Sequence, residues 1–223
     1  MNQMMKHKKG YSRKPLYRYC KVKSSIASIT NLNTHAQPAQ SYLEFFCLKK
    51  FELDNDVVFM ESQPFTLLYE YNGRSNCVYT PDTLIKKRDG SIWIIEVKPS
   101  NKISKKMEKK FKHIAWCLWQ SGIHFAFMTE KEVGSWVAMN TTLMLSCHLK
   151  SSHSDESLHW LIRKLPFICT YSEMLDIAKD AGYDVGAIMT LLGRSKLFMN
   201  MDQPLRGASL IAKAPFLNKE VAA

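Results

Sequence analysis

The chain has 223 residues, of which 46% are hydrophobic and 23% are charged, an ordinary composition that argues against overall disorder. This length allows one sizeable core and, beside it, a small second domain. A formal charge of +11 favours a polyanionic partner, most often nucleic acid; the alternative is a basic surface that is simply solvated.

The six cysteines are widely separated and form no CxxC pair, which argues against both a zinc site and a disulfide framework. No apolar run approaches the roughly 20 residues of a membrane-spanning helix. The basic N-terminus lacks the hydrophobic core of a secretory signal. We therefore expect a cytoplasmic protein with reduced thiols and no membrane partner.

The N-terminal segment is strongly basic. Residues 1–24 contain eight Lys and Arg, no Asp or Glu, and three tyrosines. Because phosphate contacts require only positive charge, this segment is predicted to be an arm along a DNA backbone, with contacts from Lys8, Lys9, Arg13 and Lys14. The alternative is a frayed tail that only keeps the chain in solution.

A central α/β domain is predicted over residues 25–150. Ser41 and Glu44 have the spacing of a capping box and predict a helix to about Phe51. Runs rich in Val, Ile, Phe and Tyr predict strands at residues 56–61, 65–71, 77–85, 91–98 and 124–129. Asp89-Gly90 predicts a hairpin between the third and fourth strands, because glycine tolerates the positive φ of such turns.

Residues 104–119 change to a helical period. A strand, a helix of this length and a further strand predict a parallel crossover. Apart from the apolar stripe, the helix surface carries the lysines Lys105, Lys106, Lys109, Lys110 and Lys112. This face is either solvated or one wall of a DNA channel, whose candidate contacts are Lys105, Lys106 and Lys109.

The C-terminal domain is predicted over residues 155–223, after a polar boundary. Two short helices joined by a Gly-containing turn, followed by a hairpin, suggest a winged helix. The second of these helices carries mostly apolar side chains, Ala187, Ile188, Met189, Leu191 and Leu192. A base-reading helix normally carries several polar side chains, so packing or protein docking is favoured over sequence readout.

Two neighbouring strand ends carry a candidate metal site. Glu96 and Lys98 point to one face of their strand, and pairing across the hairpin can bring Asp82 beside Glu96. Mg²⁺ prefers oxygen ligands and is usually held by one or two carboxylates. The predicted ligands are therefore Asp82, Glu96 and the Val97 carbonyl, with Glu44 as a candidate third acid.

Lys98 cannot bind a cation, but an ammonium beside a scissile phosphate can orient or help deprotonate water and offset developing charge. Each residue also has a structural alternative. Asp82 could be a turn residue, Glu44 a helix cap, and Glu96 with Lys98 an exposed strand pair. The apolar run IWIIEV instead predicts a strand buried on both faces, where charges without a function are costly.

At these residues the chain resembles the PD-(D/E)xK nuclease superfamily and, more narrowly, the TnsA endonuclease subunit of heteromeric transposases. The resemblance covers roughly residues 40–140 and rests on Ser41-x-x-Glu44, Gln63-Pro64, Tyr79-Thr80-Pro81-Asp82 and Glu96-Val97-Lys98-Pro99. It implies a restriction-endonuclease-like α/β fold, a mixed sheet flanked by helices, with a small winged-helix-like C-terminal domain. The short chain is similar to the compact TnsA proteins of CRISPR-associated transposons.

The resemblance implies a bacterial DNA endonuclease that uses Mg²⁺, with Mn²⁺ as a substitute, and cuts the 5′ ends of a transposon. Glu44, Asp82 and Glu96 match the family's acidic ligands and Lys98 its catalytic lysine, while Gln63 is expected to hydrogen-bond near the site. The implied partners are double-stranded DNA at transposon ends, a TnsB-type transposase and a TnsC-type ATPase. Two alternatives stay open: a stand-alone restriction, repair or junction-resolving nuclease, and a non-catalytic DNA-binding adaptor.

Overall fold

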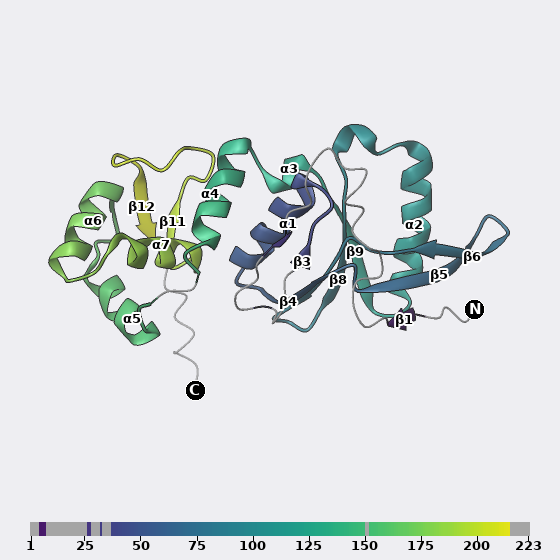
Figure 1. Ribbon diagram of the computed structural model, residues 1–223, viewed down its shortest axis with the longest axis horizontal. Coiled ribbons are helices and arrows are strands. Elements are labelled where there is room, and N and C mark those ends of the chain that lie inside the picture. Colours follow the sequence, from purple (N-terminus) through teal and green to yellow (C-terminus); the bar gives the residue numbers. More distant parts are fainter. Residues whose placement is uncertain (1–4, 8–25, 28–31, 33–36, 150–151, 215–223) are drawn as a thin grey trace. The chain divides into compact units, whose positions relative to one another are not determined.

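The computed structural model describes residues 5–7, 26–27, 32, 37–149 and 152–214 (Figure 1). The chain divides into two compact units, Met1–Ser135 and Trp136–Ala223. Within the described ranges, no helix has both the length and the apolar character that crossing a membrane would need. The cysteines in these ranges are free thiols. Of the predicted basic arm, residues 1–24, the structure describes only Met5–His7, which form the short strand β1.

A mixed four-stranded sheet forms the centre of the first unit, in the order β4-β7-β8-β9. Its strands are β4 (Val57–Ser62), β7 (Thr83–Lys87), β8 (Ile92–Val97) and β9 (Ile123–Met128). The predicted Asp89-Gly90 turn joins the antiparallel pair β7 and β8, and Gly90 has a φ of 87°. Helix α2 (Lys105–Trp119) connects β8 to the parallel strand β9, so the predicted crossover is confirmed.

A second, three-stranded sheet has the order β1-β5-β6, and its long strands are β5 (Phe65–Tyr71) and β6 (Arg74–Tyr79). The prediction of one strand over residues 77–85 is wrong. The chain leaves this sheet after Tyr79 and enters the four-stranded sheet at Thr83. Pro81, which has no backbone N–H for a ladder hydrogen bond, lies in the link between the two sheets.

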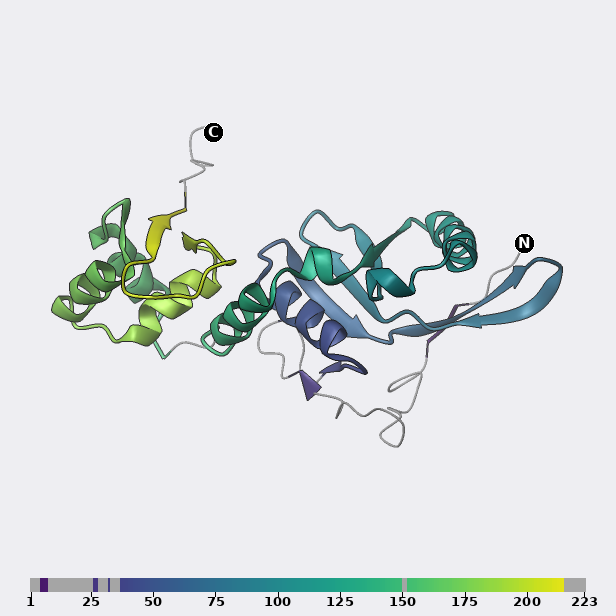
Figure 2. The same cartoon turned by 90° about the horizontal axis from the view of Figure 1, so that it is seen from above.

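Helices cover the four-stranded sheet, with α1 (Tyr42–Leu53) and α2 on opposite sides (Figure 2). Ile94 of β8 is fully buried and packs in one cluster with Phe111, Ile114 and Leu118 of α2. Phe65, Leu67 and Tyr69 of β5 belong to the same cluster, which therefore joins both sheets to α2. This is the predicted mixed sheet flanked by helices, the arrangement of a restriction-endonuclease-like fold.

The second unit begins earlier than predicted. The sequence indicated a boundary between residues 150 and 155, whereas the structure divides the chain between Ser135 and Trp136. Helix α4 (Trp136–Ser146) packs on α7 (Val185–Gly193), so closely that a Cβ on Gly193 would lie 3.2 Å from the Leu145 carbonyl oxygen. The Thr190 hydroxyl also donates to the His148 carbonyl, at 2.9 Å. These contacts make α4 part of the C-terminal core.

The rest of the second unit contains the predicted helices and hairpin. Its elements are α5 (Asp155–Lys164), β10 (Ile168–Thr170), α6 (Tyr171–Asp180), α7, β11 (Leu197–Met199) and β12 (Leu210–Lys213). The three strands form an antiparallel sheet in the order β10-β12-β11. The apolar side chains of α7 are buried, in agreement with a packing role. The winged-helix assignment stays a prediction.

Charge is distributed unevenly between the two units. Residues 1–135 contain 22 Lys and Arg and 12 Asp and Glu, a net charge of +10. Residues 136–223 contain 9 basic and 8 acidic residues, a net charge of +1. The first unit therefore attracts a polyanion more strongly than the second unit does.

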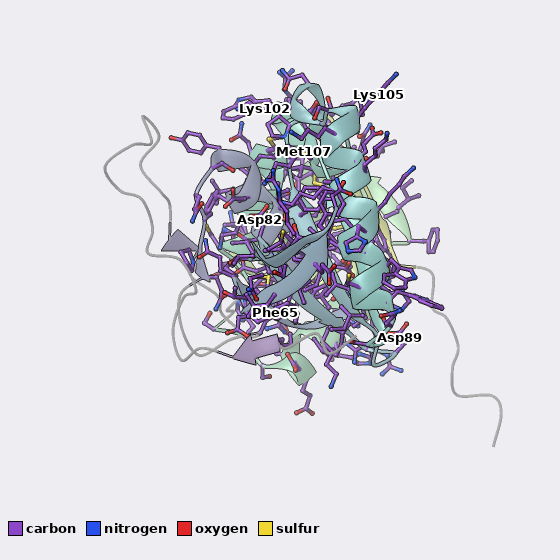
Figure 3. The ribbon with its side chains drawn as sticks, turned by 90° about the vertical axis from the view of Figure 1, so that its right-hand side faces the viewer. Phe65, Asp82, Asp89, Lys102, Lys105 and Met107 are labelled. Atoms are coloured by element: carbon purple, nitrogen blue, oxygen red, sulfur yellow. The ribbon has the colours of Figure 1, made fainter. Side chains whose placement is uncertain are left out.

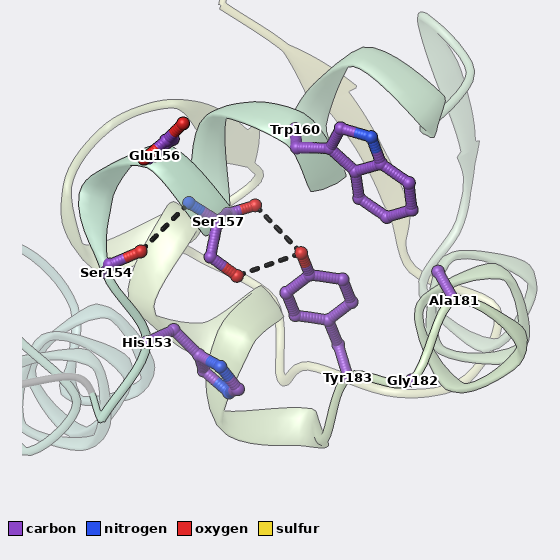
Figure 4. A pocket seen from close by; sticks show the side chains of 8 residues that line it. All are labelled: His153, Ser154, Glu156, Ser157, Trp160, Ala181, Gly182 and Tyr183. Carbon is purple, nitrogen blue, oxygen red and sulfur yellow. Dashed lines mark hydrogen bonds between the residues drawn. The ribbon is translucent and has the colours of Figure 1, made fainter.

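A shallow, aromatic-lined pocket lies on the second unit, between α5 and the turn that joins α6 to α7 (Figure 4). The hydroxyl of Tyr183 accepts a hydrogen bond from Ser157 Oγ and donates one to the Ser157 carbonyl, both at 2.9 Å. His153 Nε2 donates to Asp184 Oδ1 at 3.1 Å, and Trp160 stacks against Tyr183. These contacts hold α5 against the turn, so the residues that line the pocket stabilise the fold of the second unit.

We expect Tyr183→Phe to lower the free energy of unfolding by about 1–2 kcal/mol, because two hydrogen bonds of a half-buried hydroxyl are lost. The matched control is Tyr171→Phe, which should change stability by less than about 0.5 kcal/mol, because among the described residues the Tyr171 hydroxyl reaches only the Met189 sulfur, at 3.6 Å. Urea unfolding of both full-length variants measures the difference. Equal effects of the two substitutions would contradict this role for Tyr183.

Candidate active site

The pairing of β7 with β8 brings Asp82 next to Glu96. Thr83 is opposite Ile95 in the antiparallel ladder, so Asp82, one residue earlier, is level with Glu96. Side chains alternate along β8, so Glu96 lies on the same face as Ile94, which packs against α2. The two carboxylates therefore lie side by side, as the hairpin and the spacing predicted, and the structure places them on the α2 side of the sheet.

The Lys98 ammonium lies among three oxygens at this sheet end. Its Nζ is 3.0 Å from Asp82 Oδ2, 2.8 Å from Glu96 Oε1 and 3.0 Å from the Val97 carbonyl oxygen. The side chains of Asp82 and Glu96 are almost fully buried, whereas that of Lys98 is 28% exposed. The three oxygens predicted as metal ligands thus converge on one positive charge.

Burial and charge shift the titration of this cluster. The pKa of Glu96 is raised, first because burial disfavours its ionised form and then because Asp82 adds a second negative charge nearby. For Lys98, burial alone would lower the pKa, but Asp82 and Glu96 outweigh it and raise the pKa of the ammonium. Lys98 is therefore positively charged at neutral pH and offsets the charge of the buried acids.

Backbone hydrogen bonds fix the position of Asp82. The Val97 N–H donates to Asp82 Oδ2 at 3.0 Å, and the Gln63 N–H donates to the Asp82 carbonyl, also at 3.0 Å. Gln63 lies between β4 and β5, is buried, and has a left-handed φ of 51°, a conformation that costs free energy for a residue other than glycine. The structure thus brings Gln63 to the site through its backbone, and the role expected of the residue stays a prediction.

The segment after Lys98 is held by Glu130, the first residue of α3 (Glu130–Val133). The Ser100 N–H donates to Glu130 Oε2 at 2.9 Å, and the Ser100 hydroxyl donates to Glu130 Oε1. These hydrogen bonds lower the pKa of Glu130. The Lys98 N–H donates to the Met128 carbonyl at 3.0 Å. The backbone on both sides of the lysine is therefore tied to β9 and α3.

Tyr79 was not among the predicted site residues, but the structure brings it into contact with the site. Its hydroxyl donates to Glu96 Oε2 at 2.8 Å, and its ring packs edge-on against Phe111 of α2. This hydrogen bond lowers the pKa of Glu96, against the effect of burial, and orients the carboxylate. The only signal in the sequence was the position of Tyr79 in the Tyr79-Thr80-Pro81-Asp82 motif, shortly before Asp82.

Glu44 lies close enough to Asp82 and Lys98 for their charges to act on it. Its pKa is raised, by burial first and by Asp82 second, and Lys98 partly counteracts the rise. Its oxygens nevertheless accept hydrogen bonds from the Gln40 N–H, at 2.7 Å, and the Ser41 hydroxyl, at 3.1 Å. Within the described ranges, no three His, Cys, Asp or Glu side chains cluster tightly enough to hold a metal. Glu44 therefore borders the pair of acids while capping α1.

A substitution separates the two roles of Glu44. Glutamine can replace glutamate in a helix cap, so Glu44→Gln should change the free energy of unfolding by less than about 0.5 kcal/mol. If the carboxylate acts on the reaction, cleavage should fall about 100-fold, and this is the result we expect. A single-turnover cleavage assay and urea unfolding measure the two effects. Cleavage at the wild-type rate would leave Glu44 with the cap alone.

The predicted DNA-binding lysines divide into three groups. Lys106 lines a cavity of about 500 Å³ next to the acids, together with Lys110, which the prediction left out. Lys105 and Lys109 are exposed on α2 and do not line this cavity. Lys8, Lys9, Arg13 and Lys14 lie outside the described residues. Helical periodicity identified the polar face of α2 but not which of its lysines borders the site.

The donor set fits a hard cation. Two buried carboxylate oxygens and one carbonyl oxygen approach a single point, and Mg²⁺ is commonly bound by one or two carboxylates with water and substrate phosphate. All three donors are hard oxygens, and the buried Cys47 thiol donates a hydrogen bond to the Met128 sulfur. The residues present are therefore those expected for Mg²⁺ or Mn²⁺ rather than for zinc.

Residues 54–130 match a family model described as TnsA-like endonuclease N terminal. These residues form a TnsA-like endonuclease domain. Asp82, Glu96, Val97 and Lys98 all lie within the TnsA-like domain, whereas Glu44 precedes it and the second unit follows it. Comparison with curated proteins gave no significant match. The match supports a nuclease related to transposase subunits.

Proposed function

We propose that the chain is a Mg²⁺-dependent DNA endonuclease that cleaves the 5′ ends of a transposon as one subunit of a transposase. The proposal depends above all on the convergence of Asp82, Glu96 and the Val97 carbonyl on Lys98, inside a TnsA-like endonuclease domain. Two acids and one ammonium suit hydrolysis of a phosphodiester. The nucleophile must approach a negatively charged phosphate, and a positive charge must offset the negative charge that develops on it.

Asp82, Glu96 and the Val97 carbonyl are the groups that would hold the metal. When bound, Mg²⁺ or Mn²⁺ would supply a Lewis acid for the phosphate and lower the pKa of a water molecule. Lys98 contributes a fixed positive charge where the phosphate gains negative charge, and it orients the attacking water. Tyr79 and the Val97 N–H keep the two carboxylates in place, so little reorganisation is needed during the reaction.

The expected partners follow from the same proposal. The substrate is double-stranded DNA at transposon ends, in agreement with the net charge of +10 on the first unit. A TnsB-type transposase would cut the 3′ ends, and a TnsC-type ATPase would direct the assembly to its target. The nearly neutral second unit, whose helix α7 is buried, is better suited to contacts with such proteins than to contacts with phosphates.

A reconstituted excision assay tests the proposal. The full-length chain is combined with a TnsB-type transposase and transposon-end DNA, and 5′-end and 3′-end cuts are measured separately. We expect 5′ cuts only when the chain, the transposase and Mg²⁺ are all present. Efficient cleavage by the purified chain alone would instead identify a stand-alone nuclease.

Calorimetric titration with Mg²⁺ and Mn²⁺ distinguishes the nuclease from a non-catalytic DNA-binding adaptor. The nuclease should bind either ion, and Glu96→Gln should weaken binding at least tenfold, since a buried ligand charge is lost. Asp54→Asn is the matched control, because Asp54 is exposed at the C-terminal end of α1 and does not line the cavity beside the acids. No metal binding by the wild-type chain would favour the adaptor.

A further inference from the structure

The cavity beside the acids is a groove with three chemically different parts. It lies between the β5–β6 hairpin and the first turns of α2 (Figure 3, which labels Asp82, Met107 and Lys105). Asp82, Glu96 and Lys98 are at one part of its lining. Lys106 and Lys110 of α2 form a second part. The third part is apolar and consists of Tyr71, Val78, Tyr79, Met107 and Phe111.

The size of the groove limits what can enter it. A volume of about 500 Å³ is that of a site for a small molecule. A B-DNA double helix is much larger than such a site, since its major groove alone is about 12 Å wide. A double helix can therefore lie across the opening but cannot occupy the groove. One or two nucleotides of a single strand can occupy it.

The two lysines of the groove are spaced to follow a strand. Lys106 and Lys110 are four residues apart on α2, on one helix face and about 6 Å apart along the axis. Among the described residues, neither ammonium has a carboxylate partner, unlike Lys98, which is paired with Asp82 and Glu96. Two positive charges without a carboxylate partner among the described residues thus lie along one wall of the groove, next to the acids. The separation of these two lysines along the helix is comparable with that between successive phosphates of a strand.

The apolar part of the lining is unusual for a surface that would contact only phosphates. Val78 is 58% exposed, and Tyr71 and Met107 are half-buried beside it. Accessible aromatic rings next to lysines are typical of sites that stack the bases of a single strand, and Tyr71 is such a ring, with Val78 and Met107 as apolar neighbours. A strand in this groove would therefore find both phosphate and base contacts.

We propose that the groove binds one or two nucleotides of the cleaved strand, separated from their complement, next to the scissile phosphate. Lys106 and Lys110 contact the phosphates, and Tyr71, Val78 and Met107 pack against base and sugar. This assignment rests on the proposed nuclease function. It adds that the substrate at the moment of cutting is locally single-stranded.

Matched double variants on one helix test the assignment. Lys106→Gln/Lys110→Gln removes the groove pair, and Lys105→Gln/Lys109→Gln removes two exposed lysines with the same spacing and the same charge. Binding of the full-length variants to oligothymidine and to a duplex of equal length is measured by fluorescence anisotropy at several salt concentrations. For oligothymidine, the groove variant should lower affinity at least tenfold more than the control, and its salt slope should fall by about 1.4, as two single-strand phosphate contacts require. On the duplex, the two variants should have equal effects.

A third variant tests the apolar contacts. Val78→Ser should weaken oligothymidine binding several-fold without changing the salt slope, because packing releases no counterions. Val58→Ser, an exposed valine on β4 outside the groove, should not change it. Equal effects of the two lysine pairs on oligothymidine, or an equal loss on the duplex from the groove pair, would overturn the assignment.

Cleavage by the assembled complex separates failure of this assignment from failure of the proposed function. If Asp82→Asn abolishes 5′ cleavage while the two lysine pairs reduce it equally, the groove assignment is wrong and the nuclease stands. If Asp82→Asn cleaves at the wild-type rate, the nuclease itself is wrong. The expected result is loss of cleavage in Asp82→Asn and a larger decrease for the groove pair than for the exposed pair.

Discussion

Lys98→Met is expected to abolish cleavage and, at the same time, to strengthen the binding of divalent metal. The ammonium contacts the same three oxygens that would hold Mg²⁺, so its removal leaves them available. Cleavage should fall about 100- to 1,000-fold, because a fixed positive charge beside the phosphate is lost. Calorimetry should show Mg²⁺ bound at least threefold more tightly than by the wild-type chain.

The same variant should be less stable when no metal is added. Without the ammonium, two buried carboxylates have no opposite charge nearby, which costs about 1–3 kcal/mol. This is less than for a fully enclosed ion pair, because the Lys98 side chain is 28% exposed. Added Mg²⁺ should restore stability by mass action. Urea unfolding with and without Mg²⁺ measures both effects.

The control for Lys98 is Lys102→Met, an exposed lysine in the turn η1 (Ser100–Lys102) that follows it. Lys102→Met also removes one positive charge close to Lys98 in the chain, but this charge lies outside the cluster of acids. Its stability and metal binding should equal those of the wild-type chain. Weaker metal binding by Lys98→Met than by Lys102→Met would show that the ammonium supports the metal rather than competing with it, contrary to our expectation.

Asp82→Asn should lower cleavage about 1,000-fold or more and should also remove most metal binding. The substitution keeps the shape of the side chain, and the asparagine carbonyl can still accept the hydrogen bond from the Val97 N–H. It removes the negative charge that attracts both the metal and Lys98. The fold should therefore remain intact, as far-UV circular dichroism would show, while single-turnover cleavage is lost.

Asp89→Asn is the matched control for Asp82→Asn. Asp89 is fully exposed in the β7–β8 turn, and its carboxylate accepts a hydrogen bond from the Ser91 N–H. Asparagine can accept the same bond, so cleavage should continue at the wild-type rate. If Asp82→Asn cleaved DNA within tenfold of Asp89→Asn, the acids at this sheet end would not be the reaction centre.

That Asp82 lies next to Glu96 could be predicted from the sequence, because every feature that brings them together is local along the chain. Asp89-Gly90 determined the turn, the turn determined the register, and the alternation of β8 determined the face on which Glu96 lies. The helical period of residues 104–119 was also local, and its apolar stripe is the face of α2 that packs in one cluster with Ile94. Local signals of this kind are the most reliable because they do not depend on distant parts of the chain.

Other features depend on tertiary packing and could not be predicted in this way. The change of sheet between Tyr79 and Thr83 depends on which strands are available as neighbours, and the residues themselves suit one continuous strand. Whether Lys106 or Lys105 borders the groove depends on how α2 rotates against the β5–β6 hairpin. Helix α4 buries the polar residues Thr141 and Thr142 and exposes the apolar Trp136, so it gave no periodic signal that it belongs to the second core.

The uneven charge of the two units also matters before any contact is made. At physiological ionic strength, electrostatic attraction extends only about 8 Å, so a polyanion acts mainly on the nearest charged surface. The unit with a net charge of +10 is drawn in, whereas the unit with +1 experiences almost no pull. If the polyanion is the DNA of the proposed function, diffusional encounters are biased toward those in which the first unit arrives first, and the rate of association rises without any base-specific contact.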